Sequence, residues 1–272
     1  MDLIKKLEDA VQMDDGNGHR GPKTAWWPSE LGKCRRALWY RLNGTGASNP
    51  IEPNALVKMR LGDSIHATMI DLLAKVGVEI ADEVRFEKPY PGMSLPMRGR
   101  VDALIVDEDG TLAVVEAKSS FGRGIVEMRK TGLPRRPDLL QLVAGMDGAD
   151  LVRGYLVYIA RDSAYFTQFL VEKTGQTTYL VNGAAVEVDL AEVVERLASV
   201  EQATEAPARD YVHAIKNGEM RDEFQKAGVK YKTAWQCGYC GWRALCWAPE
   251  VERLAEGDNA DAFAAIHEPQ ES

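Results

Sequence analysis

Two strand-like segments joined by a short turn constrain this chain more than any other feature. The segments are MRGRVDALIV at 97–106 and TLAVVEAKS at 111–119, and Asp-Glu-Asp-Gly fills positions 107–110 between them. Apolar and β-branched residues on both sides of such a turn predict an antiparallel hairpin. A third strand-like segment, EVRFEK at 83–88, precedes the hairpin. We therefore expect a three-stranded meander.

Charged side chains converge within this apolar hairpin. A pairing centred on Asp109 places Asp102 opposite Glu116. Alternate residues of a strand share a face, so Glu116 and Lys118 project together. Burying such carboxylates costs several kcal/mol unless a cation or a hydrogen-bond network compensates, and hard oxygen ligands suit Mg²⁺ or Mn²⁺. The alternative is a surface hairpin whose Glu116–Lys118 pair faces water.

Helical signals lie on both sides of the meander. Ser29 is expected to cap a helix that carries Cys34 and ends near Gly44. Pro53 is expected to open a second helix that Gly77 ends. The other expected elements are a loop or short helix at 124–134, a helix from Pro137 to about Met146, strands at 151–161 and 164–172, and a helix of about fifteen residues after Asp189.

The chain has few cysteines, and most of them are close together in the sequence. Cys237, Cys240 and Cys246 form the pattern C-x2-C-x5-C, and Cys34 is the fourth cysteine of the chain. The N-terminal segment is too charged for a secretion signal, which argues against a disulfide framework. Four thiolates suit a structural zinc ion or an iron–sulfur cluster, and coordination chemistry alone does not separate the two. Four unrelated buried thiols are the alternative.

Three short motifs together resemble a known family. Gly99-Arg100-Val101-Asp102, followed by Glu116-Ala117-Lys118, resembles the signature of the PD-(D/E)XK nuclease superfamily. Upstream, Gly62 and His66 resemble the G-x-x-x-H motif of its RecB-like branch. On a helix these two positions share a face, and the missing side chain of Gly62 is expected to leave His66 room to reach inward. A core histidine beside an apolar stripe is the alternative.

The resemblance implies a fold and a site. The fold would be α/β, with a mixed central sheet flanked by helices. Its implied metal ligands are His66, Asp102, Glu116 and the carbonyl of Ala117, which would hold Mn²⁺ or Mg²⁺. Lys118 would orient or deprotonate a water molecule, or stabilise charge that develops on phosphorus.

A further motif of the branch is matched in part. The RecB-like pattern continues with a helix that carries Gln and, four residues later, Tyr. Here Gln141 matches the glutamine, but Gly145 stands at the tyrosine position. The resemblance makes Gln141 a candidate contact near the metal, and a solvent-facing or capped glutamine is the alternative.

The cysteine spacing resembles the RecB-like nucleases that carry a [4Fe–4S] cluster, among them the CRISPR-associated Cas-four exonucleases and the AddB nuclease domain. This implies that Cys34, Cys237, Cys240 and Cys246 bind the cluster in a helical lobe formed by both termini, with structural zinc as the alternative. The expected segments are an N-terminal segment at 1–52, the nuclease core at 53–205, a cluster segment at 206–250 and a flexible tail at 251–272.

Composition bears on partners and location. The net charge of −8 argues against binding nucleic acid through bulk charge, although basic stretches adjoin the motifs at 33–41, 119–137 and 226–247. The resemblance implies a metal-dependent DNA exonuclease that acts on single-stranded or end-bearing DNA, beside a helicase or integrase-type partner. A DNA-binding subunit without turnover is the alternative. No apolar stretch approaches the roughly 18–20 residues of a membrane span, so we expect a cytoplasmic protein.

Overall fold

The computed structural model describes most of the chain as two compact units. The described residues are 2–13, 22–49, 51–208, 210, 237 and 240–246. One unit consists of Met1–Lys33 and Pro53–Gln202, and the other of Cys34–Glu52 and Ala203–Ser272. The first unit contains the sheet, and the second contains all four cysteines. The segment expected to be a flexible tail, 251–272, lies outside the described residues.

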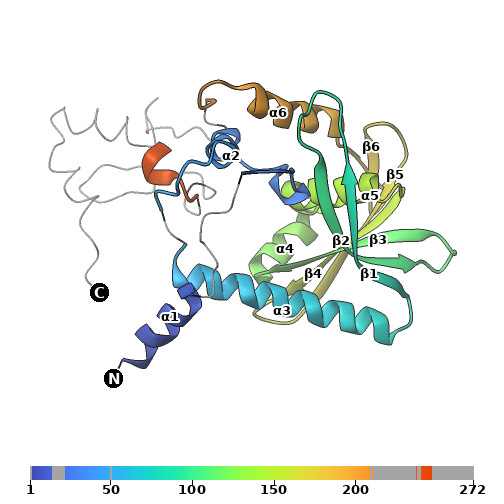
Figure 1. Cartoon of the computed structure of the whole chain (residues 1–272). Helices are drawn as coiled ribbons and strands as arrows, with labels where there is room; N and C mark the ends of the chain where they lie inside the picture. Colours follow the sequence, from blue (N-terminus) through green and yellow to red (C-terminus); the bar gives the residue numbers. More distant parts are fainter. Residues whose placement is uncertain are drawn as a thin grey trace. The chain divides into compact units, whose positions relative to one another are not determined.

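A seven-stranded sheet forms the centre of the first unit, with its strands in sequence order (Figure 1). The strands are β1 (Glu79–Lys88), β2 (Met97–Val106), β3 (Leu112–Ser120), β4 (Arg153–Ala160), β5 (Phe166–Lys173), β6 (Thr178–Val181) and β7 (Ala184–Glu187). β3 and β4 pair in parallel, and the other neighbouring pairs are antiparallel. The sheet is therefore mixed, and the α/β class expected from the sequence is confirmed.

The hairpin of β2 and β3 has the register that the turn predicts. Ala103 pairs with Val115 and Val106 with Leu112, so each pair is equidistant from Asp109. The turn closes through a hydrogen bond from Asp107 N to Thr111 O at 2.8 Å. Gly110 has a φ of 81°, a left-handed conformation that glycine adopts without steric cost.

Helices α3 (Pro53–Lys75) and α5 (Arg136–Gly148) cover opposite faces of the sheet (Figure 1). On one face, Met69 of α3 packs with Ala117 and Ile159. On the other, α5 approaches so closely that a Cβ at Gly145 would lie 3.0 Å from Val101 Cγ1. A larger side chain at position 145 has no space there, which is the physical reason for the glycine.

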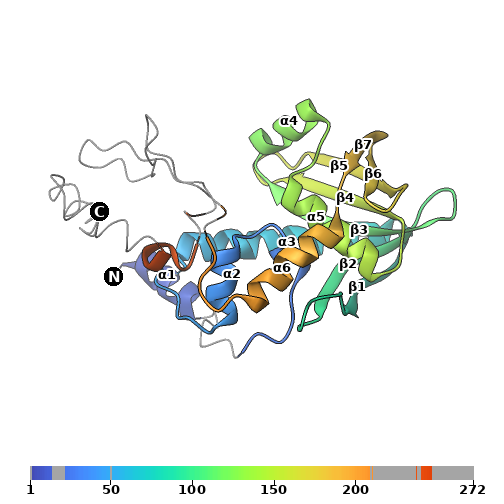
Figure 2. The same cartoon turned by 90° about the horizontal axis from the view of Figure 1, so that it is seen from above.

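The first unit has three further helices. They are α1 (Leu3–Met13), which contacts α3, α4 (Gly122–Thr131), which packs beside β4 (Figure 2), and α6 (Leu190–Gln202), which contacts α5. The sequence predicted α6 and left the segment around α4 open between loop and helix. No helix among the described residues is long and apolar enough to span a bilayer.

The predicted helix start at Ser29 is wrong. Pro28–Glu30 form a single 3₁₀ turn, and α2 (Arg35–Leu42) begins only after Cys34, which is its N-cap residue. The side chain of Glu30, rather than Ser29, accepts the Trp27 N–H, at 2.9 Å. Glu30 also pairs with Lys23 Nζ at 2.6 Å, so this turn is fixed by a buried ion pair.

The second unit joins segments from both ends of the chain. Trp39 Nε1 donates to Ala203 O at 3.0 Å, and Arg36 Nε donates to Pro207 O at 2.6 Å. Further along, Trp242 Nε1 donates to Thr45 O at 2.9 Å. Indole and guanidinium donors therefore connect residues that are more than 160 positions apart.

Candidate active site

The candidate site begins where β2 and β3 part. Their ladder ends at Ala103 and Val115, and beyond it Asp102 Oδ2 accepts the backbone N–H of Ala117 at 2.7 Å. On its other side, β2 pairs with β1 through Ala103 and Val101, but Asp102 between them has no paired residue on β1. The residue opposite it, Glu83, has a left-handed backbone with a φ of 47°. A side chain thus replaces one rung of the ladder, and Asp102 is held at the gap between the strands.

His66 reaches this gap from α3. Its Nε2 lies 3.1 Å from Asp102 Oδ1. The two groups are not aligned as a hydrogen bond, so Nε2 is buried without a hydrogen-bond partner among the described residues. The Asp102 carboxylate raises the pKa of His66 above 6.5, first through its close contact with the imidazole and then through its charge, although burial opposes this. A buried, unsatisfied nitrogen beside a carboxylate is an arrangement that a cation would complete.

Glu116, Lys118 and Gln141 form a closed hydrogen-bonded triangle. Lys118 Nζ donates to Glu116 Oε1 and, at 2.9 Å, to Gln141 Oε1. Gln141 Nε2 donates to the same Glu116 oxygen at 2.7 Å. The strand brings Glu116 and Lys118 together as its alternation predicts, and α5 supplies Gln141 from above them. Each side chain fixes the other two.

Burial controls the charges of this triangle. Glu116 is 3% exposed, and desolvation raises its pKa to about 7 although Lys118 opposes the shift. For Lys118, burial disfavours the ammonium, but attraction to Glu116 outweighs burial and raises the lysine pKa above 10.5. Asp102 is 8% exposed, and its charge adds to the rise of the Glu116 pKa. The site therefore holds two closely spaced buried carboxylates and a protonated lysine.

Three further residues belong to this site that the sequence did not single out. Tyr158, on β4, pairs in register with Lys118 and donates its hydroxyl to Asp138 Oδ2 at 2.7 Å. Arg135 Nε donates to the same oxygen at 2.8 Å. The Asp138 charge raises the pKa values of Glu116 and Lys118. Asp138 lies three positions before Gln141, so helical spacing was the available signal.

The glycine of the G-x-x-x-H motif acts differently from its expected role. A Cβ at Gly62 would lie 3.7 Å from Ser119 Oγ, which is ordinary van der Waals contact. Gly62 therefore faces β3, and its missing side chain is not what admits His66. His66 approaches Asp102 because it lies one turn further along α3.

The donors near Asp102 suit a hard divalent cation in kind. They are two carboxylates, a buried imidazole nitrogen and the Ala117 backbone, which lies between them. As the side chains stand, the described residues contain no group of three His, Cys, Asp or Glu side chains arranged to hold a metal. Ion pairing explains this: Lys118 occupies Glu116, and Asp102 faces His66 and the Ala117 N–H.

All four cysteines lie in the second unit, and none of them forms a disulfide. Cys240 N donates to Cys237 O at 3.1 Å, so these two residues share one turn. Burial raises the pKa of the Cys240 thiol, and the nearby Cys34 and Cys246 thiols add to the rise. Cys34 is thus within electrostatic range of the C-terminal cysteines, although none of these described thiols forms a group arranged to hold a metal.

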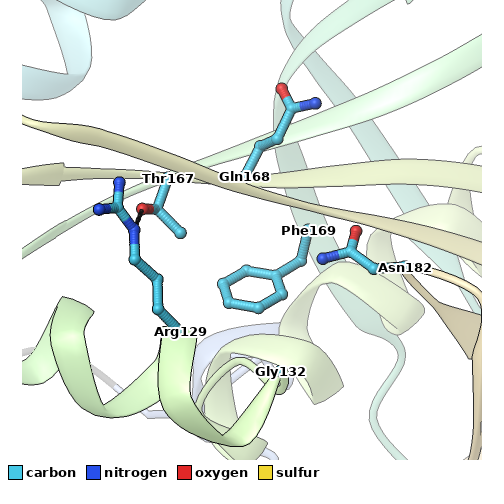
Figure 3. A pocket seen from close by; sticks show the side chains of 6 residues that line it. All are labelled: Arg129, Gly132, Thr167, Gln168, Phe169 and Asn182. Atoms are coloured by element: carbon cyan, nitrogen blue, oxygen red, sulfur yellow. Dashed lines mark hydrogen bonds between the residues drawn. The ribbon is translucent and has the colours of Figure 1, made fainter.

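Two pockets of the first unit lie apart from these residues. One, of about 330 Å³, is lined by Arg129, Gly132, Thr167, Gln168, Phe169 and Asn182 (Figure 3). The other, of about 670 Å³, lies between α6 and the β5–β6 turn and includes Tyr90 and Tyr179. Neither of these two pockets is lined by Asp102 or Glu116.

Comparison with known proteins gives the family. The model of the PD-(D/E)XK nuclease superfamily matches residues 5–247. The crystal structure of SSO0001 is 19% identical with a TM-score of 0.53, over 90% of this chain and 96% of that chain. Crystal structures of the alkaline exonuclease LHK-Exo from Laribacter hongkongensis and of LHK-Exo in complex with dAMP are 13% and 15% identical, with TM-scores of 0.44, over 73% of this chain and 91% of theirs.

Among curated proteins, none matches. The likeness to SSO0001 supports the fold, because it extends over nearly all of both chains. The superfamily model extends from α1 to Trp247 and includes every residue of the carboxylate and lysine site. On this match, the chain belongs to the PD-(D/E)XK nuclease superfamily.

Proposed function

We propose that this protein is a metal-dependent DNA nuclease that hydrolyses phosphodiester bonds in single-stranded or end-bearing DNA as an exonuclease. The observation that carries the proposal is the buried pair of Asp102 and Glu116, held against Lys118 and the unsatisfied Nε2 of His66. Burying a carboxylate costs free energy of folding unless a partner compensates its charge. Buried carboxylates therefore occur most often at functional sites. Superfamily membership gives that function its chemical class.

The residues that would hold Mg²⁺ or Mn²⁺ are His66, Asp102, Glu116 and the carbonyl of Ala117. A bound divalent ion supplies Lewis-acid chemistry and lowers the pKa of a water molecule. Metal binding needs both carboxylates deprotonated, and the raised pKa of Glu116 makes its ionisation costly. Lys118 and Gln141 both donate to the same Glu116 oxygen, so neither bond uses the second oxygen, which could face a metal ion.

Lys118 acts as a cation in this proposal. Attraction to Glu116 raises its pKa, so beside Glu116 it carries its proton at neutral pH. It can then donate a hydrogen bond to a phosphate oxygen and stabilise the negative charge that develops during phosphodiester cleavage. Charge stabilisation is the role that we propose for this lysine.

The proposal is tested by cleavage of matched single-stranded DNA substrates. Linear and circular forms of one sequence are incubated with the full-length protein and Mn²⁺. An exonuclease degrades the linear form alone. Lys118→Met should lower kcat by at least about 100-fold, while the dissociation constant for DNA changes little. Equal loss of both substrates would show an endonuclease, and binding without cleavage would leave a DNA-binding subunit that needs a helicase or integrase-type partner.

The four cysteines form a second part of the proposal. We infer that Cys34, Cys237, Cys240 and Cys246 hold a [4Fe–4S] cluster, with a structural zinc ion as the alternative. The free thiols and the proximity of Cys34 to Cys240 and Cys246 support a shared centre. Anaerobically purified protein should be brown and contain about four iron atoms per chain, whereas colourless protein with one zinc would establish the alternative. A cytoplasmic, reducing location fits free thiols.

A further inference from the structure

We propose that Phe121, Arg161 and Phe166 form a platform on which bases of single-stranded DNA stack beside the active site. This inference rests on the proposed function and names the surface that receives its substrate. The three residues come from the ends of β3, β4 and β5 within the first unit. We refer to them as the stacking platform.

The first observation is an arginine already stacked on an exposed ring. The Arg161 guanidinium lies 4.5 Å from the centre of the Phe121 ring, which is 55% exposed. Arg161 Nε is buried and has no hydrogen-bond partner within the part of the chain that the structure describes. A guanidinium in this setting can donate a hydrogen bond to a phosphate oxygen and add cation–π attraction to a stacked base.

The second observation is the exposure of neighbouring aromatic rings. Tyr165 and Phe166 are 67% and 52% exposed, so burial of these two side chains adds little to the stability of the fold. Neighbouring exposed apolar side chains often mark a binding surface. Phe166 pairs directly with Ile159, so the two side chains share the sheet face that Met69 of α3 covers. That is also the face from which His66 approaches Asp102.

The backbone holds these residues firmly in place. Arg161 N donates to Ser120 O at 2.8 Å, which joins the ends of β4 and β3. Arg129 of α4 donates to Thr167 Oγ1 at 2.6 Å and to Phe166 O at 2.7 Å, and Figure 3 shows the first of these bonds. The aromatic rings are therefore carried by a braced edge rather than by a free loop.

A strand on the platform would meet a positive group beside the rings. Arg161 holds its guanidinium against Phe121, and Arg123, two residues after Phe121, is exposed on the first turn of α4. Of the acidic neighbours, Asp162 uses one carboxylate oxygen to accept the Gly122 N–H at 2.8 Å, and Glu127 lies one turn further along α4. Basic groups beside exposed aromatic rings bind single strands with little sequence preference.

The platform lies on the same sheet face as His66. Phe121 keeps an extended backbone, with φ −76° and ψ 151°, and follows Ala117 by four residues, so alternation places these two side chains on one face. Glu116 and Lys118 lie on the opposite side of β3, against Gln141 of α5. A strand bound on the platform would therefore approach the site from the side of His66 and Asp102. The platform fixes the position of the strand and not the identity of its bases.

The test measures binding of a fluorescent oligothymidine by the full-length protein in a Glu116→Gln background, so that no cleavage occurs. Phe121→Ala should weaken binding by about 5- to 150-fold, the range for loss of one stacked base. Phe121→Trp should retain it. Leu112→Ala, which removes an exposed apolar side chain at the other end of β3, is the matched control and should have no effect.

Two further measurements separate the platform from the proposed function. Arg161→Met should reduce the slope of log affinity against log salt by about 0.7, the value for one lost phosphate contact on a single strand. When a single abasic nucleotide is moved along the oligothymidine, one position should weaken binding by protein that retains Phe121 but not by Phe121→Ala. If Phe121→Ala and Arg161→Met leave DNA binding unchanged, and protein with its native Glu116 cleaves DNA normally, the platform is overturned and the proposed function is not. If protein with its native Glu116 does not cleave DNA, the proposed function is overturned instead.

Discussion

At the scale of single residues, Gln141 is the group whose role is easiest to isolate. It contacts Glu116 and Lys118 at once and carries no charge, so replacing it leaves the ionic pair intact. Gln141→Ala should lower kcat by about 10- to 100-fold, the usual effect of losing a group that orients catalytic side chains. Steady-state kinetics on linear single-stranded DNA measure this.

The matched control is Gln12→Ala, which changes an exposed glutamine on α1. The KM for DNA should change less than kcat in Gln141→Ala, because Gln141 acts through Glu116 and Lys118. A large rise in KM with an unchanged kcat would show that Gln141 binds substrate rather than positions these two side chains.

Local patterns carry most of what the sequence predicts about the site. Strand alternation brings Glu116 beside Lys118, and the turn centre sets the register that brings Asp102 near them. Helical spacing from Gln141 could have pointed to Asp138, but Tyr158 was missed because its contact with Asp138 joins β4 to α5, which no local pattern encodes. The role expected for Gly62 was wrong for the same reason, since it depends on how far α3 lies from Ser119.

At the scale of elements, the contact between α5 and β1 allows no additional atoms. A Cβ at Gly148, the last residue of α5, would lie 2.3 Å from Cδ2 of Phe86. Gly148→Ala should therefore lower the free energy of unfolding by about 1–3 kcal/mol, as overpacking does. Gly62→Ala is the control, because its Cβ would have ordinary contact with Ser119. Urea denaturation of both variants checks this, and equal stabilities would contradict the packing.

The β2–β3 turn should make stability depend on acid. Arg153 Nη1 donates to Asp109 Oδ2 at 2.7 Å, and this bond lowers the pKa of Asp109 from 3.8 to about 2. Because the folded pKa lies below the unfolded one, the contact stabilises the folded state above pH 4. That stabilisation is lost as the pH falls toward 2.

Replacing the arginine tests this dependence. Arg153→Met should lower the free energy of unfolding at pH 6, and its difference from wild type should shrink between pH 4 and pH 3 as Asp109 begins to take up a proton. Urea denaturation at the three pH values gives the comparison. A difference that stays constant, or grows in acid, would show that the Asp109 contact does not act through the charge of its carboxylate.

The elements themselves differ in how well the sequence predicts them. β2, β3 and α6 have long, regular apolar patterns and lie where those patterns place them. β6 and β7 have four residues each, too few for an alternation to be recognised, and they form because β5 offers an edge to pair with. The 3₁₀ turn at Pro28–Glu30 depends on the Glu30–Lys23 ion pair rather than on helix propensity.

At the scale of the whole molecule, the second unit should depend on its metal centre. Within this unit, the ring of Tyr40 packs against that of Trp242, with 6.2 Å between ring centres, so segments from the two ends of the chain meet. A metal that joins distant segments offsets the entropy of closing a long loop. Cys240→Ser should therefore lose the metal and lower the melting temperature, as metal analysis and calorimetry would show. Full metal content in Cys240→Ser would contradict the four-cysteine centre.

The order of the fold also separates what can be predicted from what cannot. The meander and the helices that flank a mixed sheet follow from patterns within each segment and from family resemblance. The parallel pairing of β3 with β4 was not predicted, because no local pattern encodes it. The resemblance implies a lobe formed by both termini, but the boundary after Lys33 does not follow from it, because that boundary depends on contacts between the chain's two ends.

The central claim is that the buried carboxylates and Lys118 hydrolyse DNA with a divalent metal. The most direct measurement is a time course on end-labelled single-stranded DNA with Mn²⁺, for full-length wild type beside Glu116→Gln. The account predicts stepwise shortening by wild type, at least about 100-fold slower cleavage by the variant, and DNA binding by both. Cleavage by Glu116→Gln at the wild-type rate would contradict the account.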